Sequence, residues 1–548
     1  MTDRDTAQET QNAGHQTIAQ LLQQGLFHHR QGDIPIAMER YSEVLSKDPK
    51  NADALYYVAV IACQEGQYKQ GVDLIKRALT LVAPQARMLN ILGQALDRLK
   101  QPLEAIKALD QAIALDPNLA AAHGNRANIL VDAGMPAEAL KSFDRALELD
   151  PDSIPDLLNR GALLAPLGRY DDALRNYDKV IALEPNNPEV HSNRANLLKD
   201  LGLIELGGGA AESARFDEAQ AAYGRAIKIN PRLGEAYFGR GMLKLTRGDF
   251  AGGFADYEYR SEVGRPGFTP LPQPRWDGAP LNGERLVLLA EQGLGDLIQF
   301  SRFAPALAAQ GIDVTLLVKP AMAPLMRTLN GVTVAGDITE VESDTRPFRW
   351  LPLMSAPHIL GTTLDTLPRD IPYLSPEPAR VADWAGRLGG GTFKIGINWN
   401  PGNPDHTVTS RRDIPLAAFA DLAALPGVEL ISLQKGPQAN QIAAVPFGDK
   451  IKVIEADMKA DADFFLDTAA VLQHLDLVAG CDTSIVHLAG ALGRPVFTAI
   501  PVMSDWRWLL KREDSPWYPS MRLFRQDASR DWTPVLARIA DAVRQMMS

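Results

Sequence analysis

The stretch Asp482-Thr483-Ser484-Ile485-Val486-His487-Leu488-Ala489-Gly490-Ala491-Leu492-Gly493-Arg494-Pro495 follows an apolar run at 475–479. The apolar run predicts a buried strand, and the Leu- and Ala-rich residues after it predict a helix. Asp482, Thr483 and Ser484 are all good N-cap residues, so one of them should begin this helix. A helix N-terminus at the carboxyl edge of a parallel sheet is a place where α/β proteins bind phosphate. The alternative interpretation is an ordinary capped helix with a partly buried His487.

Alternating strands and helices are predicted throughout the second half of the chain. Strands are expected at 285–290, 314–318, 393–399, 429–433, 475–479 and 496–500, with a weaker one near 332, and helices at 297–309 and 533–547. The Pro-rich, poorly periodic residues 340–378 separate two series. Two such series predict two facing doubly wound lobes with a cleft between them. The final amphipathic helix is expected to pack back across both lobes.

The first half of the chain repeats with a period of 34 residues. Small residues recur at positions 25, 59, 93, 127, 161 and 195, and prolines at 49, 117, 151 and 185. This spacing is the tetratricopeptide pattern, in which small residues let two antiparallel helices approach closely. The period is displaced once, by 12 residues, and we interpret 203–215 as a lengthened loop between the two helices of the sixth repeat.

The expected fold is therefore a multidomain α plus α/β chain. It comprises a flexible tail at 1–16, about seven repeats at 17–260, a Pro- and Gly-rich linker at 261–283, and two Rossmann-like lobes at 284–380 and 381–548.

The net charge, the cysteine content and the length of the apolar runs argue against some classes of protein. The formal net charge is −11, which argues against a nucleic-acid partner because phosphate-backbone binding needs a basic face. The two cysteines, Cys63 and Cys481, lie far apart, which fits a reducing compartment. The chain has no run of 18 apolar residues and a polar N-terminus, so we expect no membrane span and a cytoplasmic location.

A glycine turn joins the first predicted strand to its helix. Gly293 and Gly295 allow close backbone approach to a ligand. Asp296, which follows them, would repel a phosphate but is suited to accepting a proton from a hydroxyl nucleophile. An N-cap role is the alternative for Asp296.

Two cationic positions follow strands of the second series. Arg411 and Arg412 end a long polar loop, and Lys435 ends the strand at 429–433. Arginine forks suit diphosphate oxygens, so we expect Arg412, Lys435 and the 482–487 turn to meet in one crevice. A solvated surface pair is the alternative for the arginines. No metal site is expected. Asp461 and Asp463 resemble a manganese-binding carboxylate pair, but they lie in a charged loop before a helix, and we favour that interpretation.

Three asparagines recur at the repeat spacing: Asn125, Asn159 and Asn193. They fall in the first helices of their repeats, which line the groove of such solenoids. An amide both donates and accepts hydrogen bonds, so these side chains are candidates for gripping the backbone of an extended protein acceptor. A purely structural role is the alternative.

Several motifs resemble those of bacterial tetratricopeptide-repeat glycosyltransferases, whose catalytic half is related to the heptosyltransferases and whose plan is similar to O-GlcNAc transferase. The motifs are Ala290-Glu291-Gln292-Gly293-Leu294-Gly295-Asp296, Gly402-Asn403-Pro404-Asp405-His406, Ser432-Leu433-Gln434-Lys435-Gly436, Asp482-Thr483-Ser484 with His487, Asp505-Trp506-Arg507-Trp508-Leu509 and the segment 512–519. One departure is that Val408-Thr409 stands where family members often have Asn-Asp.

The resemblance implies a GT-B fold and inverting, metal-independent transfer from a nucleotide sugar to Ser or Thr of a protein. It maps the base to Asp296, with His487 as the other candidate. It maps donor binding to Arg412, Lys435, Asp482, Thr483, Ser484 and His487. Some proteins of this plan glycosylate flagellin with a nonulosonic acid. The alternatives are a catalytically silent repeat scaffold and a transferase that acts on a lipid-linked or free glycan.

Overall fold

The computed structural model describes residues 17–264, 268–291, 293–401, 411–455, 458 and 465–548. The predicted tail at 1–16 and the 402–410 part of the polar loop, with its Val408-Thr409 departure, lie outside the described residues. The chain divides into two units, residues 1–185 and 186–548, and each is described by itself.

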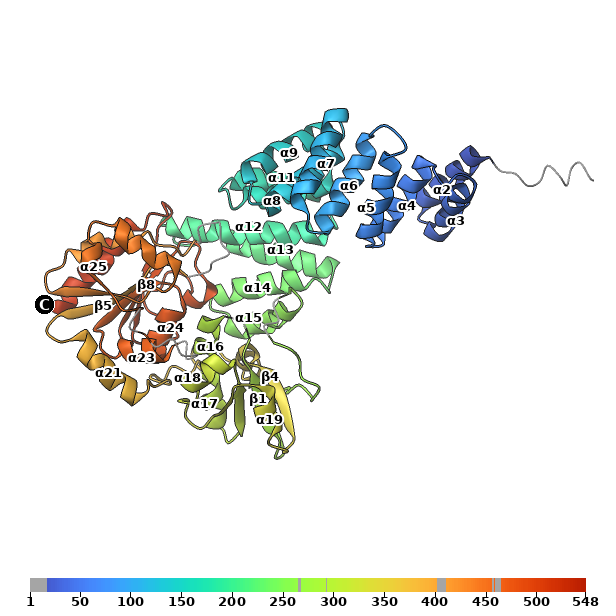
Figure 1. The fold of residues 1–548 in the computed structure, drawn as a ribbon. Helices are drawn as coiled ribbons and strands as arrows, with labels where there is room; N and C mark the ends of the chain where they lie inside the picture. The colour runs from blue at the N-terminus through green and yellow to red at the C-terminus, as the bar shows by residue number, and fades with distance from the viewer. Residues whose placement is uncertain (1–16, 265–267, 292, 402–410, 456–457, 459–464) are drawn as a thin grey trace, which may run out of the picture. The chain divides into compact units, whose positions relative to one another are not determined.

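The described residues of unit 1 form five helix pairs, which Figure 1 shows in blue to cyan. The helices are α2 Ile18–Gln31, α3 Ile34–Lys47, α4 Ala52–Gln64, α5 Tyr68–Leu79, α6 Ala86–Arg98, α7 Pro102–Leu115, α8 Ala120–Asp132, α9 Pro136–Leu149, α10 Ile154–Leu164 and α11 Tyr170–Leu183. A Cβ atom at Gly93 would lie 2.6 Å from Leu109 Cγ, and one at Gly161 would lie 2.6 Å from the Tyr177 ring. The small residues of the 34-residue pattern are therefore needed where paired helices touch.

Unit 2 begins with two further pairs, α12 Pro188–Gly207 with α13 Arg215–Ile229 and α14 Gly234–Thr246 with α15 Phe250–Tyr257. The interpretation of 203–215 as a loop is wrong for its first part, because α12 continues for 20 residues through Gly207. Leu203 is buried and Leu206 half-buried in this extension, so the apolar period of the helix runs on into the insertion. The connection between the helices is confined to 208–214.

The amino-terminal lobe contains a parallel sheet of order β3-β2-β1-β4. Its elements are β1 Arg285–Leu289, α16 Leu294–Phe300, α17 Phe303–Ala308, β2 Val314–Leu317, α18 Ala323–Met326, β3 Thr333–Ala335, α19 Ile338–Glu342, β4 Phe348–Pro352 and α20 Ala356–Ile359. The helix predicted at 297–309 starts earlier and is interrupted at 301–302. Strand β4 lies in the segment interpreted as irregular, and its pairing with β1 makes it a strand despite the flanking prolines.

The carboxy-terminal lobe contains a six-stranded parallel sheet of order β10-β9-β8-β5-β6-β7. Its elements are α21 Pro378–Leu388, β5 Phe393–Asn398, α22 Ala420–Ala423, β6 Val428–Ser432, β7 Ile451–Val453, α23 Leu466–Leu472, β8 Leu477–Cys481, α24 Ser484–Ala491, β9 Val496–Ile500, β10 Met521–Arg525 and α25 Thr533–Met547. This is the doubly wound order, whose direction switches between β5 and β8. Helix α25 packs on α22, β9 and β10 of this lobe, so the expectation that it crosses both lobes is wrong.

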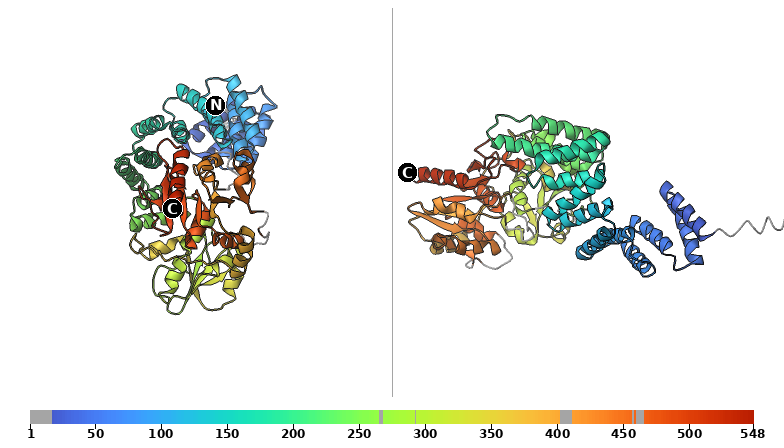
Figure 2. Two further views of the ribbon diagram at one scale, coloured as in Figure 1. Left: turned by 90° about the vertical axis from the view of Figure 1, so that its left-hand side faces the viewer. Right: turned by 90° about the horizontal axis from the view of Figure 1, so that it is seen from above.

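The seventh repeat and the two lobes share one hydrophobic core. Phe250 and Phe254 of α15 meet the Trp506 ring edge-on, at centroid distances of 6.2 and 5.7 Å. Trp517 stacks on Phe250 at 5.9 Å. In both views of Figure 2 the yellow-green and orange-red lobes occupy separate regions of this unit. The shared core holds these two lobes and the last repeat together.

A buried ion pair joins the end of the repeats to the glycine turn. Arg260 Nη2 lies 2.7 Å from Glu291 Oε1, and the Glu291 carboxylate also accepts from Met354 N. Burial raises the pKa of Glu291, and the Arg260 charge opposes that effect. The pair therefore anchors the turn that carries Asp296.

Replacing Glu291 with Gln is expected to lower the free energy of unfolding by about 3 kcal/mol, because it leaves a buried guanidinium without this partner. This decrease in the free energy of unfolding is at the low end of the range for breaking a buried ion pair, because Glu258 Oε1 remains 3.0 Å from Arg260 Nη1. Urea unfolding measures it. Asp217→Asn, which breaks the exposed pair with Arg247, is the control and should change stability by less than about 1 kcal/mol. Equal effects of the two substitutions would contradict this account.

Candidate functional site

A cavity of about 370 Å³ lies beyond the carboxyl ends of β1 and β8, and residues of both lobes and of α14 and α15 line it. The structure brings eight of the sequence-predicted site residues to its wall: Gly293, Gly295, Asp296, Arg412, Asp482, Thr483, Ser484 and His487. The direction switch of the larger sheet lies at the same place, which is where open α/β sheets bind ligands.

Helix α24 presents its N-terminus to this cavity. Thr483 is the N-cap, but its hydroxyl donates to Asn398 Oδ1 at 2.8 Å and does not cap the helix. Asn398 is itself oriented by a 3.0 Å hydrogen bond from its amide to Gln434 Oε1. The first backbone N–H groups of α24 therefore have no side-chain cap, which suits an anionic ligand.

Arg412 adds a positive charge beside this helix end. Its Nη1 donates to the carbonyl oxygen of Asp482 at 3.0 Å, and its side chain lines the cavity. The neighbouring Arg411 lies 3.5 Å from Asp200 Oδ2 of α12 and is not a lining residue. The two arginines therefore have different surroundings, and only Arg412 is placed to meet a ligand in the cavity.

Asp296 forms an ion pair across the two lobes. Arg507 Nη2 donates to Asp296 Oδ1 at 2.5 Å, and Arg507 also donates to Gln299 Oε1 at 2.6 Å. Burial alone would lower the pKa of Arg507, but Asp505 and Asp296 hold it above its usual value. Within the described residues, Arg507 is the one hydrogen-bond donor to the Asp296 carboxylate. Among the described residues, no hydrogen-bond donor contacts Oδ2 of Asp296.

His487 is buried, and both of its ring nitrogens face protein groups. Nδ1 lies 3.0 Å from the Tyr518 hydroxyl and Nε2 lies 3.6 Å from Asp482 Oδ1. The Trp508 indole stacks on the ring at a centroid distance of 5.4 Å. Burial would raise the pKa of Asp482, but His487 and Arg412 hold it below its usual value. The imidazole is thus fixed in place by its neighbours.

The glycine turn brings two helices of different lobes together. A Cβ atom at Gly295 would lie 3.2 Å from His487 Cδ2 and 3.7 Å from Ser484 Cα. The absence of a side chain at Gly295 therefore lets α16 approach the N-terminus of α24. Gly293 is the N-cap of α16 and also lines the cavity.

Four predicted site residues do not line the cavity. Lys435 follows β6 and is half-buried, and its pKa is lowered by burial while Glu455 and Asp467 oppose this. The expected convergence of Lys435 with Arg412 is therefore not seen. Asn125 donates to Asn90 Oδ1 and Asn159 donates to Asn128 Oδ1, each at 2.9 Å, and Asn193 lies half-buried on α12.

Three residues near the site were not predicted from the sequence as site residues: Arg507, Asn398 and Tyr518. Arg507 carried a signal, since it is a charge between two tryptophans in the apolar run 506–510. Asn398 also carried a signal, because it is a polar residue at the end of a predicted strand. Tyr518 lies in the segment 512–519 that carries the resemblance, but its contact with His487 depends on the folding of a distant segment.

Within the described ranges, no group of three His, Cys, Asp or Glu side chains is arranged to hold a metal ion. Asp461 and Asp463 lie outside these ranges. None of the helices described combines the length and the hydrophobicity needed to cross a bilayer.

Family comparisons match the first half of the chain. The tetratricopeptide repeat family matches residues 120–153, with further TPR families at 161–202 and 204–267. The family of anaphase-promoting complex, cyclosome, subunit 3 matches residues 30–112.

Two curated proteins and two solved structures are similar to parts of the chain. Protein FlbA of Caulobacter vibrioides is 33% identical over 333 residues, which cover 56% of this chain and 54% of FlbA. Cellulose synthase 2 operon protein C of Komagataeibacter xylinus is 32% identical over 20% of this chain and 9% of its own length. The structure of YrrB, a TPR protein with an unusual peptide-binding site, is 25% identical over 31% of this chain and 87% of its own, with a TM-score of 0.26. The structure of Pseudomonas aeruginosa pilF is 23% identical over 40% of this chain and 94% of its own, with a TM-score of 0.35.

The FlbA match covers 56% of this chain, and the residues that precede β1 make up a smaller share than that. The match therefore includes residues of the α/β region. The matched residues span about half the length of FlbA. The amino-terminal part of this chain consists of tetratricopeptide repeats, and parallel α/β sheets follow it.

Proposed function

We propose that the protein is a glycosyltransferase of the GT-B type, which transfers a sugar from a nucleotide sugar to a Ser or Thr hydroxyl of a protein acceptor. The observation that carries the proposal is the cavity itself. It combines a carboxylate from one lobe with an uncapped helix N-terminus and an arginine from the other, at the direction switch of a doubly wound sheet.

The donor phosphates fit the carboxy-terminal side of the cavity. The N–H groups at the start of α24 and the Arg412 guanidinium both favour negative charge. These groups would stabilise the negative charge that builds up on the departing nucleotide. We expect no metal ion to be needed for this step.

Asp296 is the proposed base. Its carboxylate takes the proton of the acceptor hydroxyl, the hydroxyl oxygen forms a bond to the anomeric carbon, and the bond from that carbon to the donor phosphate breaks. The nucleotide leaves with the bonding electron pair, and the configuration at the anomeric carbon is inverted. Arg507 positions Asp296. His487, with both nitrogens turned to protein groups, is assigned to holding the α24 turn.

The acceptor side of the cavity is formed by the seventh repeat. Phe238 and Met242 of α14 and Tyr257 of α15 line it, and Phe238 and Met242 are only partly buried. A protein held by the repeats would therefore reach Asp296 past an apolar wall. The TPR region supports a protein acceptor, since such repeats commonly bind peptides or proteins. Flagellin is the specific acceptor that the resemblance suggests, with a nonulosonic acid as the sugar that is transferred to it.

The double substitution Phe238→Ala, Met242→Ala is expected to raise KM for the protein acceptor by about tenfold, because it removes apolar contact area beside the acceptor. Hydrolysis of the nucleotide sugar in the absence of acceptor should keep its rate. Steady-state kinetics with purified acceptor measures both. Met546→Ala, an exposed methionine at the end of α25, is the control. An unchanged KM in the double variant would mean that the acceptor enters by another route.

A thermal-shift panel of UDP-, GDP-, ADP- and CMP-linked ligands tests the donor half of this proposal. A ligand at 100 times its Kd adds about 2.7 kcal/mol of apparent stability. One nucleotide class should raise the midpoint, and a CMP ligand would favour the nonulosonic-acid donor. If no nucleotide raises it, the scaffold alternative is favoured.

A further inference from the structure

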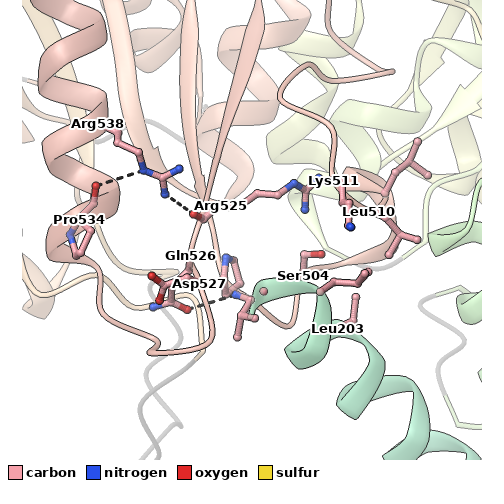
Figure 3. Close-up of a pocket in the computed structure, with 14 residues that line it drawn as sticks. Leu203, Ser504, Leu510, Lys511, Arg525, Gln526, Asp527, Pro534 and Arg538 are labelled. Atoms are coloured by element: carbon pink, nitrogen blue, oxygen red, sulfur yellow. Dashed lines mark hydrogen bonds between the residues drawn. The ribbon is translucent and has the colours of Figure 1, made fainter. Parts of the chain in front are cut away.

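A second pocket, of about 290 Å³, lies on the carboxy-terminal lobe and shares no lining residue with the candidate site. Figure 3 shows Pro534 and Arg538 of α25 on one side of it and Leu203 of α12 on the other. The pocket exists because α12 continues into the 12-residue insertion. A Cβ atom at Gly207 would lie 2.4 Å from Val502 Cγ2, so the helix end is pressed against this lobe.

Three cations line this pocket: Lys511, Arg525 and Arg538. Backbone carbonyls hold all three. Lys511 Nζ donates to Ala211 O at 2.5 Å, Arg525 Nε donates to Arg512 O at 2.9 Å, and Arg538 donates to Arg525 O. In the described part of the chain, none of the three has a carboxylate oxygen within 4.0 Å. Asp527 is the single acidic residue of the lining.

The Arg538 charge contributes to lowering the pKa of Asp527, but the lining still holds three cations against this one carboxylate, beside apolar surface. Burial lowers the pKa of Arg525 to about 10, since no carboxylate offsets its loss of hydration. Each cation also keeps at least one N–H beyond the carbonyl contacts described. A bound oxyanion would supply both the missing counter-charge and the acceptors. Leu203, Leu206 and Leu510 provide apolar contact for the rest of a small molecule.

We propose that this pocket is a second ligand site, which binds a compact organic molecule through a phosphate or carboxylate group held by Arg525, Arg538 and Lys511. The site is separate from the donor site and does not depend on the proposed transfer reaction. Its floor belongs to the carboxy-terminal lobe and its wall to the extended helix of the sixth repeat.

Inorganic phosphate is the probe, titrated by calorimetry into the full-length Arg412→Ala variant so that the candidate donor site contributes little. We expect one saturable binding event. Adding Arg538→Glu should weaken it by about tenfold or more, because the substitution places a negative charge at the site. Adding Arg544→Glu, an exposed arginine on the same helix that does not line the pocket, should change the Kd by less than about twofold.

Arg538 and Lys511 are both exposed, so their substitution should leave the fold intact, and thermal midpoints without phosphate check this. Lys511→Glu provides an independent second variant with the same expected loss. Phosphate binding that is absent from the Arg412→Ala protein, or unchanged by both pocket substitutions, would overturn the proposal. In crystals of the wild-type protein soaked with tungstate, the anomalous peak is expected between Arg525 and Arg538. A peak at the α24 N-terminus alone would also overturn it.

Discussion

The Asp296→Asn variant is expected to transfer sugar about 10²- to 10⁴-fold more slowly than the wild type, which is the usual contribution of a general base. Asn keeps the size of the side chain and an oxygen that accepts from Arg507, so the contact between the lobes is preserved. The change removes the ability to take a proton, together with the negative charge beside Arg507. Single-turnover kinetics with saturating donor measures the chemical step.

Donor binding by Asp296→Asn should match the wild type. Its thermal stability should fall, because the buried Arg507 guanidinium loses a charged partner and keeps only Asp505. His487→Gln tests the other base candidate. Because His487 contacts Tyr518 and Asp482, this variant should lose donor affinity and stability rather than the chemical step alone. If Asp296→Asn retains full activity and His487→Gln loses only the chemical step, the assignment of the base is wrong.

The second large effect is expected at Arg412. Replacing it with Ala removes a charge-assisted contact to the donor phosphates, worth about 1.5–3 kcal/mol, which corresponds to a Kd about 10- to 100-fold higher. Isothermal titration with the nucleotide identified in the thermal-shift panel measures the change.

Arg411→Ala is a matched control for Arg412→Ala. The two residues are adjacent and carry the same charge, but Arg411 faces Asp200 of α12 and does not line the cavity. Its removal should change the Kd by less than about threefold, since exposed pairs contribute little. Equal losses in the two variants would show that Arg412 acts only through the overall charge of the lobe.

The repeats could be predicted from sequence because each small residue is required by a local contact between two paired helices. Gly93 and Gly161 stand where a paired helix leaves no room for a Cβ atom, so the requirement repeats with the structure. Most strands of the lobes were also predictable as apolar runs. Strand β10 was missed because charged Arg522 and Arg525 interrupt its apolar period. Strand β4 was missed because only its pairing with β1 marks it as a strand.

The site could be predicted only in parts. The 482–487 turn and Asp296 each follow a strand, and local pattern identifies both. Their meeting depends on contacts such as that of Arg507 with Asp296, which are 211 residues apart in the chain. Lys435 shows the limit of this reasoning. It also follows a strand, but β6 is not one of the two strands that flank the direction switch, and strand order cannot be read from apolar runs.

Transfer of labelled sugar into protein tests the central claim most directly. Purified full-length protein is incubated with the radiolabelled nucleotide sugar chosen by the thermal-shift panel and an extract of cells that lack this protein. We predict label in acid-precipitable protein, sensitive to protease and absent with Asp296→Asn. Label in a lipid or free-glycan fraction would favour the alternative acceptors. No label in any fraction, or the same label with Asp296→Asn, would contradict the account and favour a repeat scaffold without transferase activity.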